Sequence, residues 1–572
     1  KMNGLVLLVI AMVVLIVAYV VYGRYLERTW GVDPNAKTPA IKNDDGVDYV
    51  PSNKWNVFAH QFSSIAGAGP VTGPVMALMF GWIPTVLWIL VGGIFFGAVQ
   101  DFGALYASVK SDGKSMGGII EEYIGKTGRK LFFLFCWLFT LLVIAAFADM
   151  VAGTFNGFGA DGSKVAANGS AASISMLYIV VAIGFGFFLR KFKVSGKLQA
   201  AIGIVLILLM LAVGIAFPIY FDKTTWLYVV FVYIFFASIT PMWLLKQPRD
   251  YLTTFLFVGM IIAAVVGVLI YNPTISTPAF TGFVTDSGSY LFPTLFVTIA
   301  CGAVSGFHSL VSSETSSKQI ENEKDMLQVG YGSMLLESLL AILVVVVVGS
   351  LSSLIADGTL NQQLTAMVTV EGGATPFTQF AVGVTGFVSQ LGLPQEWGIC
   401  IMTMFVSALA LTSLDAVARI SRLSFQEFFE IEPGQEQSGI NKFLTNKYVA
   451  TLISLFCGYL LSLGGYNNIW PLFGSANQLL AAMVLISISV FLKVTGRKGW
   501  MLYIPMCLML VVTLTSLGMS IYNIVTAWMT TGTIDFLTSG LQLIVAVLLV
   551  ALGVLVAFFD FKKLFESKKA TA

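Results

Sequence analysis

The chain has 572 residues, of which 57% are hydrophobic and only 11% are charged, with a formal net charge of +2 and a mean hydropathy of +0.85. Ordinary soluble domains carry about 25% charged residues, so this composition excludes a water-soluble protein. It indicates an integral membrane protein whose surroundings are a lipid bilayer, and we expect no nucleic-acid partner.

Apolar stretches near the roughly 20 residues that span a bilayer recur along the whole chain. The first is too long for the apolar core of a signal peptide and runs into Arg24 without a small-residue cleavage site, so we interpret it as a spanning helix. A shorter stretch at 376–391 is interpreted as an interfacial or re-entrant helix. We predict fifteen spans, at about residues 3–22, 57–79, 83–108, 131–155, 174–190, 197–217, 226–244, 252–271, 291–311, 328–356, 396–418, 446–464, 469–492, 499–526 and 537–560.

The basic residues test this topology. If the N-terminus lies outside, every Lys and Arg except Lys1, Lys164 and Lys223 falls on connections or a tail that face the cytoplasm. Cytoplasmic loops of membrane proteins carry such an excess. The sequence therefore predicts a multi-pass protein of a bacterial inner membrane, with its N-terminus outside and its C-terminus in the cytoplasm.

Two predicted spans contain helix-breaking runs near mid-membrane. The second span reads FSSIAGAGPVTGP over residues 62–74, and the ninth reads ACGAVSGFHS over residues 300–309. Proline removes a backbone donor and glycine loosens a helix, so we expect both spans to be unwound there. Unwound backbone at membrane depth has to line a cavity or be buried in protein.

The two broken spans are the second and the ninth, seven positions apart in the order of spans, and because this number is odd they run through the bilayer in opposite directions. Each can open a group of five helices, and broken helices at matching places of two inverted halves are typical of transporters with a midplane substrate site. We therefore predict five units: a peripheral helix with an inner loop, a first five-helix repeat, two inserted helices, a second inverted repeat, and two peripheral helices with a tail. Their bounds are 1–56, 57–217, 218–290, 291–492 and 493–572.

Few side chains in the spans can carry charge. Both histidines, His60 and His308, lie in the broken spans, where each is either a hydrogen-bonded packing residue or a proton carrier. Carboxylates inside a membrane are costly and are functional candidates by default; these are Asp101, Asp149, Glu337 and Asp415. The i, i+4 spacing of Asp415 and Arg419 allows an ion pair on one helix face, as a structural alternative to proton coupling.

Uncharged polar groups offer a second kind of ion site. Thr412 and Ser413 place two hydroxyls on one helix, where they can complete an oxygen site for sodium or bond back to helix carbonyls. Asn477 and Gln478 add amides in the thirteenth span. The histidines lack the neighbours of a transition-metal site, and no soluble-enzyme motif occurs. We expect no enzyme activity and no cofactor, only a small-molecule substrate coupled to a sodium ion or a proton.

Long motifs give the chain a family resemblance. Residues 43–74 are, with one Asp inserted, similar to a signature of the carbon starvation CstA family of peptide and pyruvate transporters. GAVQDF, ACGAVSGFHSLVSSETSSK, ALTSLDAVARISR and WPLFGSANQ continue the match over most of residues 40–490. That family resembles the amino acid, polyamine and organocation superfamily. The resemblance implies an all-α polytopic protein of about 15 transmembrane helices with a LeuT-like five-plus-five inverted repeat and peripheral and inserted helices.

The resemblance also implies a site at the unwound segments. Its substrate-binding residues would be Gly67, Ala68, Gly69, Pro70, Gly302, Ala303, Ser305, Gly306 and His308, with Gln100 and Asn477. Ion coupling would involve Ala66, Thr412, Ser413, Asp415, Asp101 and Glu337, and Thr412 and Ser413 match the hydroxyl pair of a LeuT-type sodium site.

The implied function is uptake of a small carboxylate-bearing nutrient during carbon starvation, by cation symport and alternating access. Short peptides and pyruvate both remain open as substrates, as do protons and sodium as the coupling ion. A nutrient sensor or a channel without concentrative transport is the alternative class. The sequence carries no indication of an oligomeric state.

Overall fold

The computed structural model describes residues 1–572 except 47, 242–243, 371–372, 432–433 and 567–572. The described residues are almost entirely helical. A two-residue strand near the N-terminus, β1 (Met2–Asn3), pairs antiparallel with β2 (Thr274–Ile275). This fits an all-α polytopic membrane protein.

Twelve helices of the described chain are long and apolar enough to cross a membrane. Some are interrupted by short 3-10 or π segments and some by kinks. Their full extents, with the interruptions included, are α1–α2 (Gly4–Trp30), α6–α7 (Trp82–Lys110), α9 (Lys126–Phe155), α10 (Ala166–Lys191), α11 (Gly196–Ala216), α13 (Lys246–Tyr271), α14–α15 (Leu291–Lys318), α16–α17 (Glu323–Ala356), α20 (Gln395–Phe429), α23 (Tyr466–Val494), α24 (Trp500–Thr531) and α25 (Phe536–Phe565).

The other predicted spans are a broken pair and two shorter helices. α4 (Lys54–Ile65) and α5 (Gly69–Ala77, with a 3-10 turn to Phe80) meet at 47°. α12 (Lys223–Ile239) and α22 (Lys447–Ser462) have 17 and 16 residues, somewhat short for a span. Every predicted span thus coincides with an apolar helix or broken pair.

Several short helices complete the described chain, and one of them tests a prediction. α19 (Pro376–Val388) coincides with the stretch interpreted as interfacial or re-entrant, but most of its side chains are buried, and it packs on α13, α16 and α20. Its surroundings are therefore mainly other helices of the chain. The remaining short helices are α3 (Pro39–Lys42), α8 (Met116–Tyr123), α18 (Gln362–Val368) and α21 (Gly439–Leu444).

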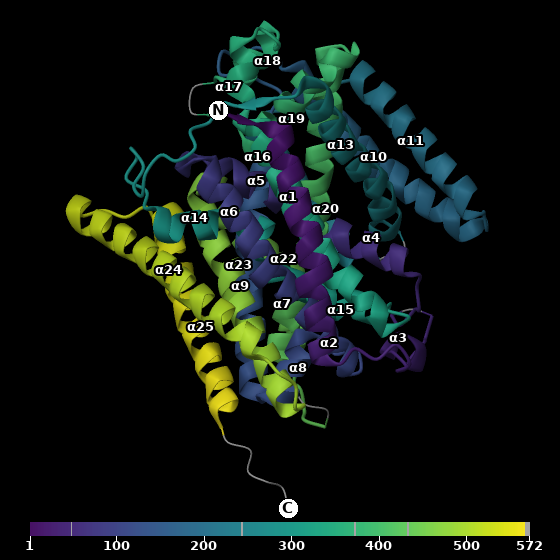
Figure 1. The fold of residues 1–572 in the computed structure, drawn as a ribbon, viewed down its shortest axis with the longest axis vertical. Helices are drawn as coiled ribbons and strands as arrows, with labels where there is room; N and C mark the ends of the chain where they lie inside the picture. The colour runs from purple at the N-terminus through teal and green to yellow at the C-terminus, as the bar shows by residue number, and fades with distance from the viewer. Residues whose placement is uncertain (47, 242–243, 371–372, 432–433, 567–572) are drawn as a thin grey trace, which may run out of the picture.

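The helices form a protected centre and an exposed periphery. α9, α20 and α23 are buried along most of their length, whereas α1, α11, α24 and α25 expose large apolar side chains. In Figure 1, α24 and α25 lie at one edge of the molecule and α10, α11 and α13 lie at the opposite edge. An apolar exposed surface of this extent suits contact with lipid.

Both predicted breaks are confirmed. Between α4 and α5 the chain leaves the helical conformation at Ala66, and Pro70 stands in the first turn of α5. The ninth span divides into α14 (Leu291–Ile299) and α15 (Phe307–Glu314), with Ala300 at a φ of +44°. α5 packs against α14, and α4 packs against α15. The two breaks therefore lie side by side in the core.

Glycines let the helices around the breaks touch through their backbones. A Cβ added to Gly73 on α5 would lie 2.3 Å from the carbonyl oxygen of Ile299, and one on Gly474 on α23 would lie 1.9 Å from that of Val297. Real side-chain atoms cannot come so close. α5, α14 and α23 are thus in direct backbone contact beside the second break.

Candidate functional site

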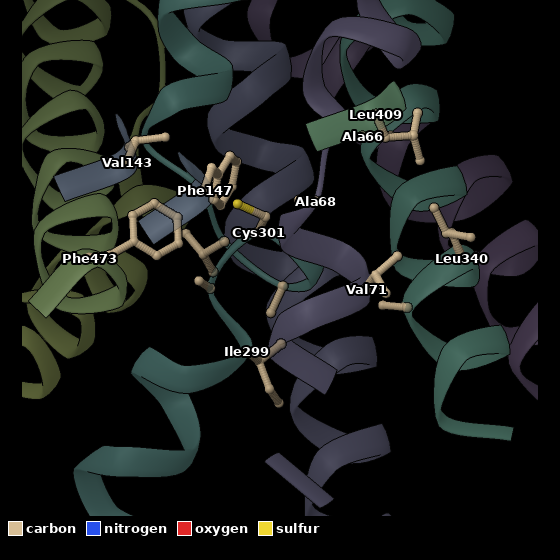
Figure 2. Close-up of a cluster of buried hydrophobic side chains, with 14 of the residues drawn as sticks. Ala66, Ala68, Val71, Val143, Phe147, Ile299, Cys301, Leu340, Leu409 and Phe473 are labelled. Carbon is tan, nitrogen blue, oxygen red and sulfur yellow. The ribbon is translucent and has the colours of Figure 1, made fainter. Parts of the chain in front are cut away.

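A narrow cavity of about 20 Å³, with room for about one water molecule, lies where the two broken spans meet. The break in the second span lines it from Ser64 to Gly69, and Cys301 and Phe307 line it from the ninth. α9, α20 and α23 supply the remaining wall, with Phe139, Val143, Phe147, Ser413, Val417, Phe473 and Asn477. Figure 2 shows Cys301 beside Phe147, near Ala68. Residues of both breaks therefore line the same cavity.

Aromatic side chains form one wall of the cavity. The ring of Phe473 on α23 lies 6.1 Å from that of Phe139 and 5.8 Å from that of Phe147, both on α9. Trp470 stacks behind them, 4.7 Å from Phe473, and is fully buried. Aromatic rings at such separations attract one another beyond their burial. The wall therefore offers an apolar surface to one part of a ligand.

Polar groups reach the cavity from the other side. α5 begins at Gly69, and its N-cap residue, Ala68, has no side chain that can accept a hydrogen bond from the first turn. Pro70 has no N–H, and the Val71 and Thr72 N–H groups donate to the Ala68 carbonyl, so the Gly69 N–H is the donor of the first turn without a hydrogen bond among the described residues. The start of a helix carries partial positive charge. Ser413 and Asn477 add a hydroxyl and an amide. No charged side chain belongs to the described residues that line the cavity.

The backbone N–H groups at the start of α15, unlike the start of α5, are hydrogen-bonded to another helix. The Phe307 N–H donates to Asn477 Oδ1 at 3.1 Å, and the Gly306 N–H donates to the Asn477 backbone carbonyl at 3.1 Å. Ser305 Oγ also bonds to the Asn477 side chain. Asn477 thus caps α15 and links it to α23, so α5 is the half-helix whose start remains uncapped.

Three ionisable residues meet next to the cavity without lining it. His308 Nδ1 lies 2.9 Å from Asp101 Oδ2 on α7, and His308 Nε2 lies 3.3 Å from Glu337 Oε2 on α16. All three side chains are 0% exposed. Asp101 Oδ1 also accepts from Gln100 Nε2 at 3.0 Å. His308 therefore bridges two carboxyl groups and is not among the residues that line the cavity.

Gln100 connects this triad to the break in the ninth span. Besides Asp101, its Nε2 donates to the Ser305 carbonyl at 3.0 Å. Ser338, next to Glu337 on α16, donates from its hydroxyl to the Gly302 carbonyl at 3.0 Å. Both ends of the unwound segment are therefore tied to helices that carry the triad.

Asp415 forms a different ion pair from the predicted one. Its Oδ2 lies 2.6 Å from Arg249 Nη1 on α13 and accepts from the Tyr233 hydroxyl on α12 at 2.8 Å. Arg419 donates instead to the backbone carbonyls of Ala237 and Thr240. The ion pair with Arg419 that the i, i+4 spacing allowed is therefore replaced by a pair with Arg249 on another helix.

The predicted hydroxyl pair divides between two places. A Cβ on Gly67 would lie 2.1 Å from Ser413 Oγ, so Ser413 faces the first break, and its hydroxyl donates back to the Leu409 carbonyl at 3.1 Å. Thr412 Oγ1 lies 3.4 Å from Thr253 Oγ1 on α13. Consecutive helical residues point about 100° apart, so the Thr412 hydroxyl lies near α13 while that of Ser413 lies at the first break. Within the described chain, no group of three or more His, Cys, Asp or Glu residues can hold a metal.

The remaining candidates lie elsewhere. Asp149 pairs with Lys223 at 2.9 Å and accepts from the Tyr466 N–H, while Gln478 donates to the Phe296 carbonyl. His60 lies on α4, outside the residues that line the cavity. The aromatic wall and Arg249 were not predicted from the sequence. Arg249 could have been recognised as a basic residue directly before the apolar part of α13.

Comparisons with known proteins agree on one family. The family model described as Carbon starvation protein CstA matches residues 3–371 and 356–516. The chain is similar to the peptide transporter CstA of Escherichia coli, with 33% identity over 90% of this chain and 81% of that protein. It is 32% identical to the peptide transporter CstA of Bacillus subtilis, over 88% and 87%. It is 31% identical to the pyruvate/proton symporter BtsT of Escherichia coli, over 91% and 82%.

Proposed function

Because the chain belongs to the carbon starvation protein CstA family, it is a multi-pass membrane transporter, and we propose that it imports a small monocarboxylate of the size of pyruvate together with a proton. The observation that carries this proposal is the cavity between the two broken spans, which has an uncapped helix start on one side and aromatic rings on the other.

The chemistry of the cavity favours a monocarboxylate. A carboxylate at the start of α5 would accept from the Gly69 N–H and from Ser413, while a short acyl part would lie against Phe147 and Phe473. A peptide would also bring an ammonium group, and none of the described residues that line the cavity is an Asp or Glu to pair with it. The relatives named peptide transporters make a dipeptide the competing substrate to test.

Alternating access is the proposed mode of transport. The breaks lie in two groups of five helices of opposite direction, residues 57–217 and 291–492, with an inserted pair at 218–290 and peripheral helices at 1–56 and 493–572. In transporters with inverted repeats, one helical bundle rocks against another around a fixed midplane site. The distribution of Lys and Arg supports an inner-membrane orientation with the N-terminus outside.

The coupling ion proposed is a proton. One relative is named a pyruvate/proton symporter, and this chain buries three titratable groups directly behind the ninth-span break. For sodium, Ser413 faces the first break but Thr412 is turned toward Thr253, so the hydroxyl pair gives a sodium ion weaker support.

Uptake by purified protein in proteoliposomes tests the proposal. Labelled pyruvate and a labelled dipeptide are supplied separately, under an inward proton gradient, an inward sodium gradient, or no gradient. We expect accumulation of pyruvate above its equilibrium level with the proton gradient alone. Accumulation of the dipeptide but not pyruvate would contradict the substrate, and entry of pyruvate that never exceeds equilibrium under any gradient would indicate a channel.

A further inference from the structure

A triad of ionisable residues, Asp101, His308 and Glu337, lies outside the cavity. Substrate binding therefore does not explain why these charges are buried. We propose that this triad is the site that holds the co-transported proton, with Glu337 as the group that gains and loses it. The proposal rests on the proton-coupled uptake proposed above and assigns its coupling step to particular atoms.

Hydrogen bonding distinguishes the two carboxyl groups. Asp101 accepts from Gln100 on one oxygen and faces His308 Nδ1 with the other, which is the environment of an ionised carboxylate. Glu337 has no hydrogen-bond partner among the described residues on either oxygen, and His308 Nε2 also has none. A buried carboxylate without donors is costly. Glu337 is therefore the member that needs a proton when the site is closed.

The proton count follows from these roles. With both carboxyl groups ionised and His308 neutral, the fully buried triad carries two negative charges. Binding of one proton forms an O–H bond on Glu337 Oε2, which faces His308 Nε2 at 3.3 Å, and leaves one negative charge that His308 and Gln100 stabilise. Release breaks that O–H bond and passes the proton to water once the site opens.

The surroundings contain little that could neutralise the triad instead. α7 presents Asp101 and Gln100, α16 presents Glu337 and the Ser338 hydroxyl, and the unwound segment presents the Cys301 thiol. Within the described parts of the chain, no Lys or Arg forms an ion pair with either carboxyl group. Proton binding is thus the available way to reduce the charge.

The same contacts join the proton to the substrate. Gln100 Nε2 bonds both to Asp101 and to the Ser305 carbonyl, and Ser305 Oγ bonds to Asn477, which lines the cavity. A ligand that displaces Asn477 or the start of α15 changes the hydrogen bonds of Gln100, and with them the stabilisation of Asp101. Occupation of the cavity and protonation of the triad are therefore coupled through a continuous chain of contacts.

The Glu337→Gln variant tests the assignment because glutamine keeps the shape of glutamate but cannot titrate. Because a neutral side chain at 337 resembles the protonated glutamate, we expect the variant to bind pyruvate, and to exchange labelled for unlabelled pyruvate without a gradient, as the wild type does at low pH, with neither changing as the pH rises. Accumulation driven by a proton gradient should fall to the equilibrium level. Asp560→Asn is the matched control: Asp560 is also fully buried, on α25, and bonds to Ser487, and its variant should accumulate pyruvate like the wild type.

Two outcomes would overturn the assignment. One is gradient-driven accumulation by Glu337→Gln with the pH profile of the wild type. The other comes from an infrared titration of the solubilised protein without substrate. The wild type should show the carbonyl band of a protonated carboxyl group, and this band should disappear as the pH rises. Glu337→Gln should lack this band. A wild-type difference spectrum that Glu337→Gln leaves unchanged would exclude Glu337 as the proton carrier.

The infrared readout separates this proposal from the proposed function. A wild-type protein that neither binds nor exchanges pyruvate would contradict the substrate, while the titration would still decide whether Glu337 binds a proton. If Glu337→Gln does not fold, His308→Gln serves instead: it keeps a hydrogen-bond donor but removes the bridge between the carboxyl groups, and should shift the pH at which the Glu337 band disappears. An unshifted band in that variant would refute the triad.

Discussion

The ion pair of Arg249 and Asp415 allows a test of whether Asp415 stabilises the fold or takes part in proton coupling. The two side chains are 1% and 4% exposed, and their charged atoms are 2.6 Å apart. Removal of one partner from such a pair strands the other charge and costs about 3 to 5 kcal/mol, whereas removal of both is close to neutral. Arg249→Met and Asp415→Asn should each destabilise the protein by that amount, and the double variant should recover most of it.

Thermal unfolding in a mild detergent measures this effect. Using about 2.1 cal/mol/K of unfolding entropy per residue, a loss of 3 to 5 kcal/mol lowers the midpoint of a chain of this length by about 2 to 4 °C. The double variant should also retain gradient-driven uptake, because the pair is interpreted as structural. Single variants as stable as the wild type would refute the energetic reasoning, and a stable double variant that has lost accumulation would make Asp415 part of the coupling machinery.

Two further predictions concern the cavity, and a third concerns the coupling ion. Gly69→Ala should weaken pyruvate binding at least tenfold, because the added Cβ would lie 2.5 Å from Cys301 Sγ. Gly184→Ala, which has open space around it, should bind pyruvate like the wild type. Equal dissociation constants for the two variants would contradict the assignment of this cavity as the substrate site. Asn477→Ala removes the cap of α15, which is worth about 1 kcal/mol, and should weaken pyruvate binding about fivefold. It should also speed amide hydrogen exchange at residues 303–307. Amide hydrogen exchange at the wild-type rate would argue against the cap. Replacing sodium with choline should not change uptake by the wild type or by Thr412→Ala, and a sodium requirement lost in that variant would support the hydroxyl pair as an ion site.

The sequence predicted the two breaks and the members of the triad for clear physical reasons. Glycine and proline in an apolar span have a local effect on the backbone, so their consequence can be read without knowing any neighbour. Asp101, His308 and Glu337 were each recognisable because burying a charge in a membrane is expensive. Their meeting was not predictable, since they come from three helices whose rotation about their axes depends on tertiary packing.

The same limit explains the predictions that differ from the structure. The spacing of Asp415 and Arg419 made a local pair geometrically possible, but a partner on α13 forms the stronger contact. Thr412 and Ser413 are neighbours in the chain, yet helical geometry turns their hydroxyls toward different helices. Local spacing therefore identified the important residues, but it was less reliable in predicting their contacts.

The backbone contacts at Gly73 and Gly474 restrict how the molecule can move. Two helices separated by side chains can slide, because rotamers adjust to take up the displacement. Where a glycine lies directly on a carbonyl, as α5 and α23 do on α14, no side chain is present to adjust, and any relative displacement produces a clash or opens a void. We therefore expect these three helices to travel together, with a conformational change taken up at side-chain contacts such as those with α9, where Phe139 and Phe147 meet Phe473.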